Sequence, residues 1–281
     1  MKKQNLFQFK INQAAKNLPK LEFIYDSIAK RMIDRLNYIK LNPISILDIG
    51  SGLELDARLL QNKYPTTKIY KLDIAIDILK LAVKKSNLMQ KIFKNNKNQD
   101  LICANANSLP LLSNHFDIVW SNLTLPYINN IEDYLKEIRR VLKVEGCFFL
   151  SGLGVDSLEE LRRVGLSTYN FPDMHMIGDI LVKLGFSNPV MDMEYITLEY
   201  DDFKLLLEDI KVLGLGFMVE NPSGLTKSEY FKLEDRFKQI TKNGKIPLTL
   251  EIFYAHAWKD KIHLDLPENQ KVIQFIKRSD K

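Results

Sequence analysis

The feature that most constrains the fold of this 281-residue chain is an alternation of short apolar runs with helix-like patterns. The runs Ile44 to Asp48, Lys68 to Asp73 and Phe116 to Ser121 have the length of buried strands, and apolar residues at helical spacing follow each of them. Strands that alternate with helices form parallel sheets, because a helix must carry the chain back to the start of the next strand. We therefore expect an α/β protein with a mostly parallel sheet.

The remaining elements are predicted from the same periodicities. Further strands are expected over residues 101–104, 147–151, 190–200 and 246–258. Helices are expected from Leu55, among residues 1–40, and over residues 74–83, 131–143, 157–165, 176–184, 202–213 and 227–241.

Composition favours one elaborated domain. Hydrophobic residues make up 46% of the chain, which is ample for a large core, and the charged residues are spread through it. We expect a helical N-terminal cap over residues 1–40, a main domain with C-terminal helical and strand additions over 41–259 and a charged tail over 260–281.

Several classes of protein are disfavoured. The N-terminus has no apolar core of signal-peptide length and no run of about 18 apolar residues occurs, so we expect a cytoplasmic protein without a membrane partner. Cys103 and Cys147 lie far apart within apolar runs, and the histidines share no metal-like spacing, so no metal site is expected.

The net charge of +5 is mild and permits an acidic partner, such as a carrier protein or a nucleic acid, without requiring one. Much of the excess lies between Lys84 and Lys97, where lysines mingle with asparagines. This stretch is either a solvated loop or a docking patch.

A glycine turn and an acid suggest a nucleoside site. Asp48-Ile49-Gly50-Ser51-Gly52 follows the first strand, where glycines allow a sharp turn and a close approach to a ligand, although purely structural turns also use glycine. Asp73 ends the second strand, where its carboxylate can accept the hydroxyl protons of a ribose bound over that turn. Asn105 and Asn122 follow the third and fourth strands, so four loops converge on the carboxyl edge of the sheet, where ligands of such folds bind.

The identity of the cofactor follows from what the turn lacks. A dinucleotide fingerprint needs glycine three positions after Gly52, but residue 55 is leucine, and no Gly-Lys-Ser/Thr of a phosphate loop follows. S-adenosylmethionine has no phosphate, and a short glycine turn with an acidic ribose clamp suits it.

Longer segments then point to a family. These are Phe116 to Leu123, Ile138 to Lys143, Leu158 to Arg162, Asp192 to Leu198, Asp209 to Gly214 and Tyr254 to Trp258. Together they resemble class I S-adenosylmethionine-dependent methyltransferases of the BioC type, the malonyl-carrier-protein O-methyltransferases of biotin synthesis. The resemblance runs from about residue 20 to residue 259.

The resemblance implies a Rossmann-like, doubly wound sheet with an antiparallel C-terminal strand and helical additions. It implies methyl transfer from S-adenosylmethionine to the free carboxylate of a malonyl thioester on an acyl carrier protein. That carboxylate is ionised at neutral pH and needs no general base, so catalysis reduces to alignment. The residues expected to bind the cofactor are Asp48, Gly50, Gly52, Asp73, Asn105, Ala106 and Asn122.

Two residues are expected to serve the substrate. Arg162 matches the arginine of the family's Leu-x-Glu-Leu-Arg segment and is predicted to grip the carboxylate, with a surface arginine as the alternative and Arg163 as its neighbour. Tyr127 is predicted to line the substrate pocket, or else to anchor its loop.

The chain also departs from the family pattern. Glu54 replaces the third glycine of the turn, Asn105 replaces an acid, and Val144-Glu145-Gly146 replaces a Pro-Gly-Gly-type turn. Glu54 is either a favourable acid in the first turn of a helix or a charge in the path of the cofactor. Two alternatives remain open. The complex I assembly proteins, a sister group that modifies an arginine, resemble the chain nearly as well, and Glu54 and Asn105 also allow a non-catalytic assembly factor. A nucleic-acid partner is not expected, since the loop at Asn122 lacks the Asn/Asp-Pro-Pro-aromatic pattern of base-methylating enzymes.

Overall fold

The computed structural model describes residues 18–82, 99–166, 168–212, 226–241 and 243–260. Within them a seven-stranded sheet has the order β3-β2-β1-β4-β5-β7-β6. Its parallel part, with the predicted strand pattern, consists of β1 (Ser45–Ile49), β2 (Lys68–Asp73), β3 (Gln99–Cys103), β4 (Phe116–Ser121) and β5 (Leu142–Leu153). The α/β class and the mostly parallel sheet are confirmed.

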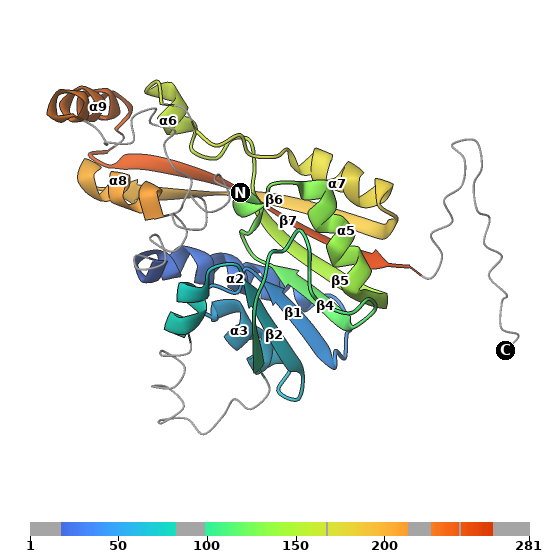
Figure 1. Cartoon of the computed structure of the whole chain (residues 1–281). Helices are drawn as coiled ribbons and strands as arrows, with labels where there is room; N and C mark the ends of the chain where they lie inside the picture. The colour runs from blue at the N-terminus through green and yellow to red at the C-terminus, as the bar shows by residue number, and fades with distance from the viewer. Residues whose placement is uncertain (1–17, 83–98, 167, 213–225, 242, 261–281) are drawn as a thin grey trace, which may run out of the picture.

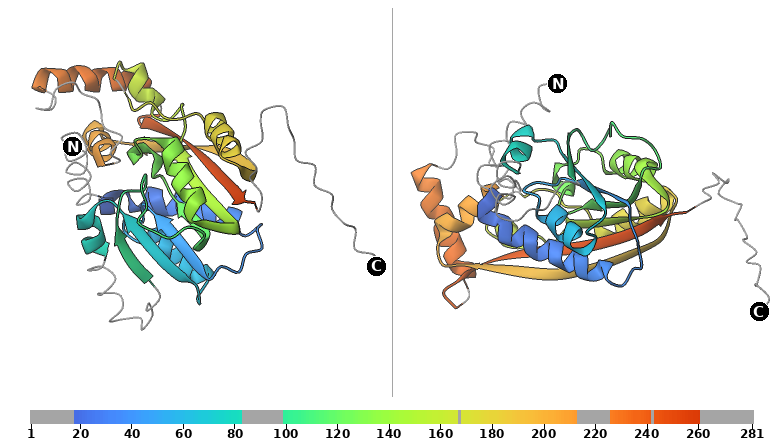
Figure 2. Two further views of the ribbon diagram at one scale, coloured as in Figure 1. Left: turned by 45° about the vertical axis from the view of Figure 1, so that its right-hand side comes forward. Right: turned by 90° about the horizontal axis from the view of Figure 1, so that it is seen from below.

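Helices cover both faces of the sheet, because successive side chains of each buried strand point to opposite sides. Ile46 of β1 belongs to a core shared with α2 (Glu22–Leu36) and α3 (Leu55–Lys63). Its neighbour Leu47 belongs to a second core, shared with α5 (Ile131–Val141) and α7 (Met174–Lys183). Figure 2 shows α2 and α5 on opposite sides of the sheet. The sheet is therefore doubly wound, as expected.

Two long strands, β6 (Phe186–Tyr200) and β7 (Ile246–Lys259), complete the sheet. Both run antiparallel to their neighbours: β7 pairs with β5, and β6 pairs with β7 over most of its length. They extend past the parallel strands to α8 (Phe203–Val212) and α9 (Lys227–Ile240) (Figure 1). These helices and the short α6 (Glu159–Arg163) form the helical additions.

The boundaries differ from the predicted ones at a few ends. β5 begins at Leu142, directly after α5, because Leu142 already pairs with Phe116 of β4. β6 begins four residues before the predicted strand, since Phe186 pairs with Lys259. The 3-10 helices η1 (Leu18–Leu21) and η2 (Leu125–Tyr127) were not predicted.

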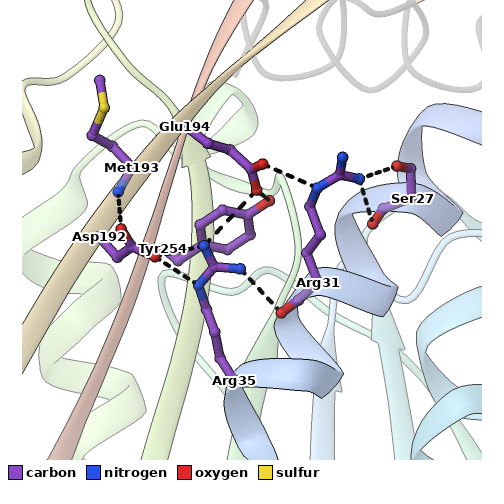
Figure 3. Close-up of polar contacts among 7 residues, drawn as sticks. All are labelled: Ser27, Arg31, Arg35, Asp192, Met193, Glu194 and Tyr254. Atoms are coloured by element: carbon purple, nitrogen blue, oxygen red, sulfur yellow. Dashed lines mark hydrogen bonds and ion pairs between the residues drawn. The ribbon is translucent and has the colours of Figure 1, made fainter.

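A polar cluster ties the N-terminal helix to the C-terminal strands (Figure 3). Arg31 of α2 donates to Glu194 of β6 at 3.1 Å, and Arg35 donates to Asp192 at 3.0 Å. The Arg35 guanidinium also lies 3.6 Å from the ring centroid of Tyr254 on β7, and the Tyr254 hydroxyl donates to Glu194 at 2.8 Å. Two of the segments that resemble the family therefore meet at α2.

Other predicted features lie outside the described residues. They are residues 1–17 of the predicted cap, the lysine-rich stretch from residue 84 to 97, and the predicted tail beyond Asp260. No helix in the described part of the chain is long and apolar enough to span a bilayer.

Candidate active site

The glycine turn follows β1 and is held against β2. The backbone N–H groups of Gly50 and Ser51 both donate to the carbonyl of Leu72, at 2.8 and 3.1 Å. Gly50 has a φ of +73°, and a Cβ there would lie 2.4 Å from the hydroxyl oxygen of Thr124. A side chain would therefore clash with the loop after β4, which is why this position requires glycine.

Asp73 lies at the end of β2 and closes the turn. Its Oδ2 accepts from the Gly52 N–H at 3.1 Å, and its Oδ1 accepts from the Ala75 N–H at 2.8 Å. Burial raises the pKa of Asp73, and these backbone hydrogen bonds oppose the rise. A carboxylate has about four lone-pair sites, and the backbone N–H groups of Gly52, Ile74 and Ala75 use three of them, so one remains for a ribose hydroxyl.

Asp48 and Ser51 carry buried polar atoms without partners. Asp48 is 1% exposed, and among the described residues its Oδ2 accepts no hydrogen bond and the Ser51 hydroxyl has no partner. Burial raises the pKa of Asp48 well above its ordinary value, and the charge of Asp56 adds to the rise while Lys71 opposes it. Unsatisfied buried acceptors are costly, so a ligand with ammonium or hydroxyl donors would be stabilised here. S-adenosylmethionine carries both, and these residues fit it.

Glu54 lies in the turn and caps α3 with a φ of +66°. Its carboxylate forms an ion pair with the ammonium group of Lys71 on β2, and both side chains are almost completely buried. The negative charge of Glu54, which could have stood in the path of the cofactor, is therefore compensated by Lys71 within the protein.

Asn122 and Asp56 form a buried network, of which only Asn122 was predicted from the sequence. The Asp56 carboxylate accepts from Trp120 Nε1 at 2.7 Å and from Asn122 Nδ2 at 3.2 Å, and Asn122 Oδ1 accepts from the Ser151 hydroxyl at 2.7 Å. Burial raises the pKa of Asp56 to about 6, although the bonds from Trp120 and Asn122 oppose the rise. The side chain of Asn122 is thus engaged with protein groups. The sequence signal that could have identified Asp56 is an acid in the first turn of the helix that follows the glycine turn.

Tyr127, in η2, meets a second tyrosine that the sequence did not reveal. Its hydroxyl is hydrogen-bonded to that of Tyr25 on α2. Burial raises the pKa of Tyr127 well above its ordinary value, and Tyr25 and the charge of Asp73 add to the rise. Asn122 Nδ2 also donates to the Tyr25 carbonyl at 3.3 Å. The first turns of α2 therefore reach the same sheet edge as the glycine turn.

Asn105 and Ala106 lie in the turn after β3, beside Asp73. The Ala104 N–H donates to the Asp73 carbonyl at 3.1 Å, and Asn105 Oδ1 accepts from the Asn107 N–H at 2.9 Å. Ala106 is buried in the core that includes Leu72. The predicted cofactor residues are thus gathered at the carboxyl ends of β1, β2, β3 and β4.

Arg162 lies on α6, after the carboxyl end of β5. Its Nη1 donates to the carbonyl of Ser157 at 2.7 Å and to the hydroxyl of Thr168 at 3.4 Å, and Nη2 donates to the carbonyl of Val155 at 3.0 Å. Arg162 lines a hollow of about 400 Å³. The other residues of this hollow are Val155, Leu166, Thr168, Tyr169, Asn170 and Phe171, so it contains none of the predicted cofactor residues.

No group of three or more His, Cys, Asp or Glu side chains within the described ranges could hold a metal ion.

Comparisons with known proteins identify the domain that carries these residues. Residues 47–150, which include the glycine turn, Asp73 and β4, match the model of the methyltransferase domain family. Among solved structures, the YcgJ protein of Bacillus subtilis has a TM-score of 0.57 at 16% identity, covering 78% of this chain and 93% of that one. Phosphoethanolamine N-methyltransferase 2 of Haemonchus contortus has a TM-score of 0.52 at 17% identity, covering 83% and 52%. Both show the class I methyltransferase fold.

Curated relatives match over nearly the whole chain. Malonyl-(acyl-carrier protein) O-methyltransferase of Gallionella capsiferriformans is 40% identical over 256 residues, 88% of either chain. The proteins of the same name from Methylovorus sp. and Laribacter hongkongensis are 35% and 33% identical, and cover 90% and 94% of this chain and 88% and 93% of their own. The family predicted from the sequence is confirmed: the chain belongs to the malonyl-(acyl-carrier protein) O-methyltransferases.

Proposed function

We propose that this protein transfers a methyl group from S-adenosylmethionine to the free carboxylate of malonyl-acyl carrier protein, an early step of biotin (pimeloyl) synthesis. The relatives carry this activity in their names, and the site supplies what the reaction needs. The observation that carries the proposal is the Arg162 guanidinium, of which two N–H groups have no acceptor among the described residues, at the same edge of the sheet as Asp48, whose Oδ2 accepts no hydrogen bond from those residues.

The proposed cofactor contacts come from the carboxyl ends of the parallel strands. Asp73 would accept from a ribose hydroxyl, Asp48 would attract the cationic part of the molecule, and the backbone at Gly50 and Gly52 would let it approach closely. Asn105 and Ala106 would lie against the adenine. When bound, S-adenosylmethionine supplies an electrophilic methyl group on its sulfonium.

Asn122 has a different proposed role. Its side chain is engaged by Asp56 and Ser151, so we assign it the positioning of the loop after β4. Any direct contact with the cofactor would then come from its backbone.

Arg162 is proposed to orient the substrate carboxylate. A guanidinium has five N–H donors, and three are engaged by Val155, Ser157 and Thr168. Within the part of the chain that the structure describes, the Nε N–H and one Nη2 N–H have no acceptor. The Nε and Nη2 atoms share one edge of a guanidinium, and N–H groups on that edge can bind a carboxylate bidentately. Because the two carbonyls fix the guanidinium, little side-chain entropy is lost when the substrate binds.

Tyr127 is proposed to line the pocket between the two sites. Its hydrogen bond to Tyr25 places an aromatic wall from α2 beside Asp73. Such a wall excludes water from the reacting carboxylate and strengthens its attraction to a cation.

The two alternatives, an assembly factor and an arginine-modifying enzyme, would require different residues in the site. An assembly factor without catalysis has no need for a buried carboxylate oxygen such as Asp48 Oδ2, which has no partner among the described residues and costs stability unless a ligand binds. An arginine-modifying enzyme would have to bind a cation, and the open Arg162 edge would repel it. The proposed substrate therefore suits the site better. The proposal further includes a carrier-protein partner, no nucleic acid and a cytoplasmic location.

Mass spectrometry of malonyl-acyl carrier protein after incubation with the protein and S-adenosylmethionine tests the proposal. We expect one added methyl on the acyl group, and no change in acetyl-acyl carrier protein, which has no free carboxylate. Cofactor binding without methylation would refute the substrate and favour an arginine side chain as the alternative. Absence of both would favour the assembly factor.

A further inference from the structure

Glu54 occupies a backbone conformation that favours glycine. Its φ of +66° lies in the left-handed region, between the glycine turn and α3. Glutamate is strained there, and a buried carboxylate is costly without a partner. The ion pair with Lys71 provides that partner, and the two side chains are 8% and 4% exposed. Glu54 therefore combines a strained backbone conformation with a buried charge that Lys71 on β2 compensates.

Lys71 is itself close to the proposed cofactor contacts. It lies two residues before Asp73 on β2, so the two side chains project from the same face. In the register of the sheet it is paired with Asp48 of β1, whose buried Oδ2 has no partner in the part of the chain that the structure describes. The electrostatic effect of Lys71 on the pKa of Asp48 agrees with this proximity. A lysine that lost Glu54 could turn to Asp48 and occupy the carboxylate that we assign to the cofactor.

The charge of the cofactor makes this competition consequential. S-adenosylmethionine carries a sulfonium and an ammonium against one carboxylate, whereas the product S-adenosylhomocysteine has lost the sulfonium charge. A buried positive charge at the site would therefore oppose the cofactor more strongly than the product.

We propose that Glu54 and Lys71 act as one charge-compensated unit that replaces a glycine in the turn and keeps the lysine charge from the cofactor. Glu54 is thus a positioning residue, and the glutamate in the turn does not obstruct binding while Lys71 is present. The inference rests on the cofactor part of the proposed function and not on the malonyl substrate.

Titration calorimetry with S-adenosylmethionine and with S-adenosylhomocysteine tests the unit. E54Q and E54G are expected to weaken S-adenosylmethionine binding by about tenfold, the size given by two unit charges roughly 10 Å apart at an effective dielectric constant of about 20. S-adenosylhomocysteine should weaken by less than about threefold, since it lacks the sulfonium charge. The double variant E54G/K71M should recover the affinity of the unaltered protein for both ligands.

Glu145 provides the matched control. It is another glutamate with a positive φ, +64°, but it lies in β5, and E145G should leave both affinities unchanged. Thermal unfolding of every variant separates misfolding from weak binding. If E54G does not fold, E54Q alone tests the inference. Glutamine keeps the volume of glutamate and can still accept a hydrogen bond from Lys71, but it has no negative charge.

Three results would overturn the inference. They are wild-type affinity in E54Q, an equal loss for the two ligands, and a double variant no better than E54G. If the unaltered protein bound neither ligand, the cofactor site itself would be refuted, and this inference with it. Failure to methylate malonyl-acyl carrier protein would leave the calorimetric comparison decisive, so the two failures are distinguishable.

Discussion

The carboxylate of Asp73 accepts a hydrogen bond of 3.1 Å from the backbone N–H of Gly52, so the second strand directly holds the turn that follows the first. The same carboxylate is proposed to bind the ribose. Asp73→Ala should therefore loosen the turn and remove the ribose contact together. We expect cofactor affinity to fall by about ten- to a hundredfold, the value of hydrogen bonds to a charged group. Calorimetry measures it.

Asp77→Ala is the control for this change. Asp77 lies a few residues further on, and its exposed side chain pairs only distantly with Lys80, at 3.8 Å. The Asp77→Ala variant should bind the cofactor with the affinity of the unaltered protein. Equal affinity in Asp73→Ala and Asp77→Ala would remove Asp73 from the site.

Arg162→Ala should spoil methyl transfer and leave cofactor affinity intact, because Arg162 touches none of the proposed cofactor residues. Misplacing a reacting group can reduce the rate by about a hundredfold, and we expect a loss of that order. Arg163→Ala is the matched control: the Arg163 guanidinium is engaged with Glu159 at 2.9 Å on the helix surface. A loss of activity in Arg163→Ala alone would reassign the role.

The tyrosine pair predicts a non-additive effect. Tyr25→Phe and Tyr127→Phe each remove the same hydroxyl contact, so the double variant should be little less stable than either single one. Each substitution should lower the free energy of unfolding by about 0.5–1.5 kcal/mol. Urea denaturation of the four proteins gives the coupling energy, and strictly additive losses would mean that the two hydroxyls do not interact.

The sequence predicted those parts of the site that follow strand ends. Gly50, Gly52 and Asp73 are marked by local patterns, because a parallel sheet brings its carboxyl ends to one edge. Tyr25 and Asp56 could not be found in this way: Asn122 contacts them across 97 and 66 residues of chain. Glu54 was recognised from the sequence as a departure from the family's glycine turn. The compensation of its charge by Lys71 was not, because it depends on the register between β1 and β2. Similarly, the periodicity predicted the strands corresponding to β6 and β7, but not that β7 lies between β5 and β6.

Asp56 should make stability depend on pH. Its pKa of about 6 is above the ordinary 3.8, so between these values the folded protein retains a proton that the unfolded chain has lost. The contribution of Asp56 to the free energy of unfolding is therefore fully present below about pH 4 and declines as the pH rises to about 6. Asp56→Asn cannot titrate. Urea denaturation should show the variant gaining stability relative to the unaltered protein between about pH 4 and 6.5, and a constant difference would contradict the raised pKa.

The cluster on α2 predicts unequal roles for its two arginines. Arg35 both pairs with Asp192 and stacks on Tyr254, whereas Arg31 pairs with Glu194 and Ser27 without an aromatic contact. Exposed ion pairs contribute at most about 1 kcal/mol, but stacking on an aromatic face adds about 0.5–1 kcal/mol or more. Arg35→Ala should therefore lower the free energy of unfolding more than Arg31→Ala does.

Arg35→Lys separates the two contributions of that residue, because lysine keeps the charge and loses the planar stack. We expect it to recover only part of the stability lost in Arg35→Ala. Lys30→Ala, which removes an exposed pair with Asp26 on the same helix, should change stability by less than about 0.5 kcal/mol. If Arg35→Lys were as stable as the unaltered protein, the stacking on Tyr254 would contribute nothing, and the contribution of Arg35 would come from its charge alone.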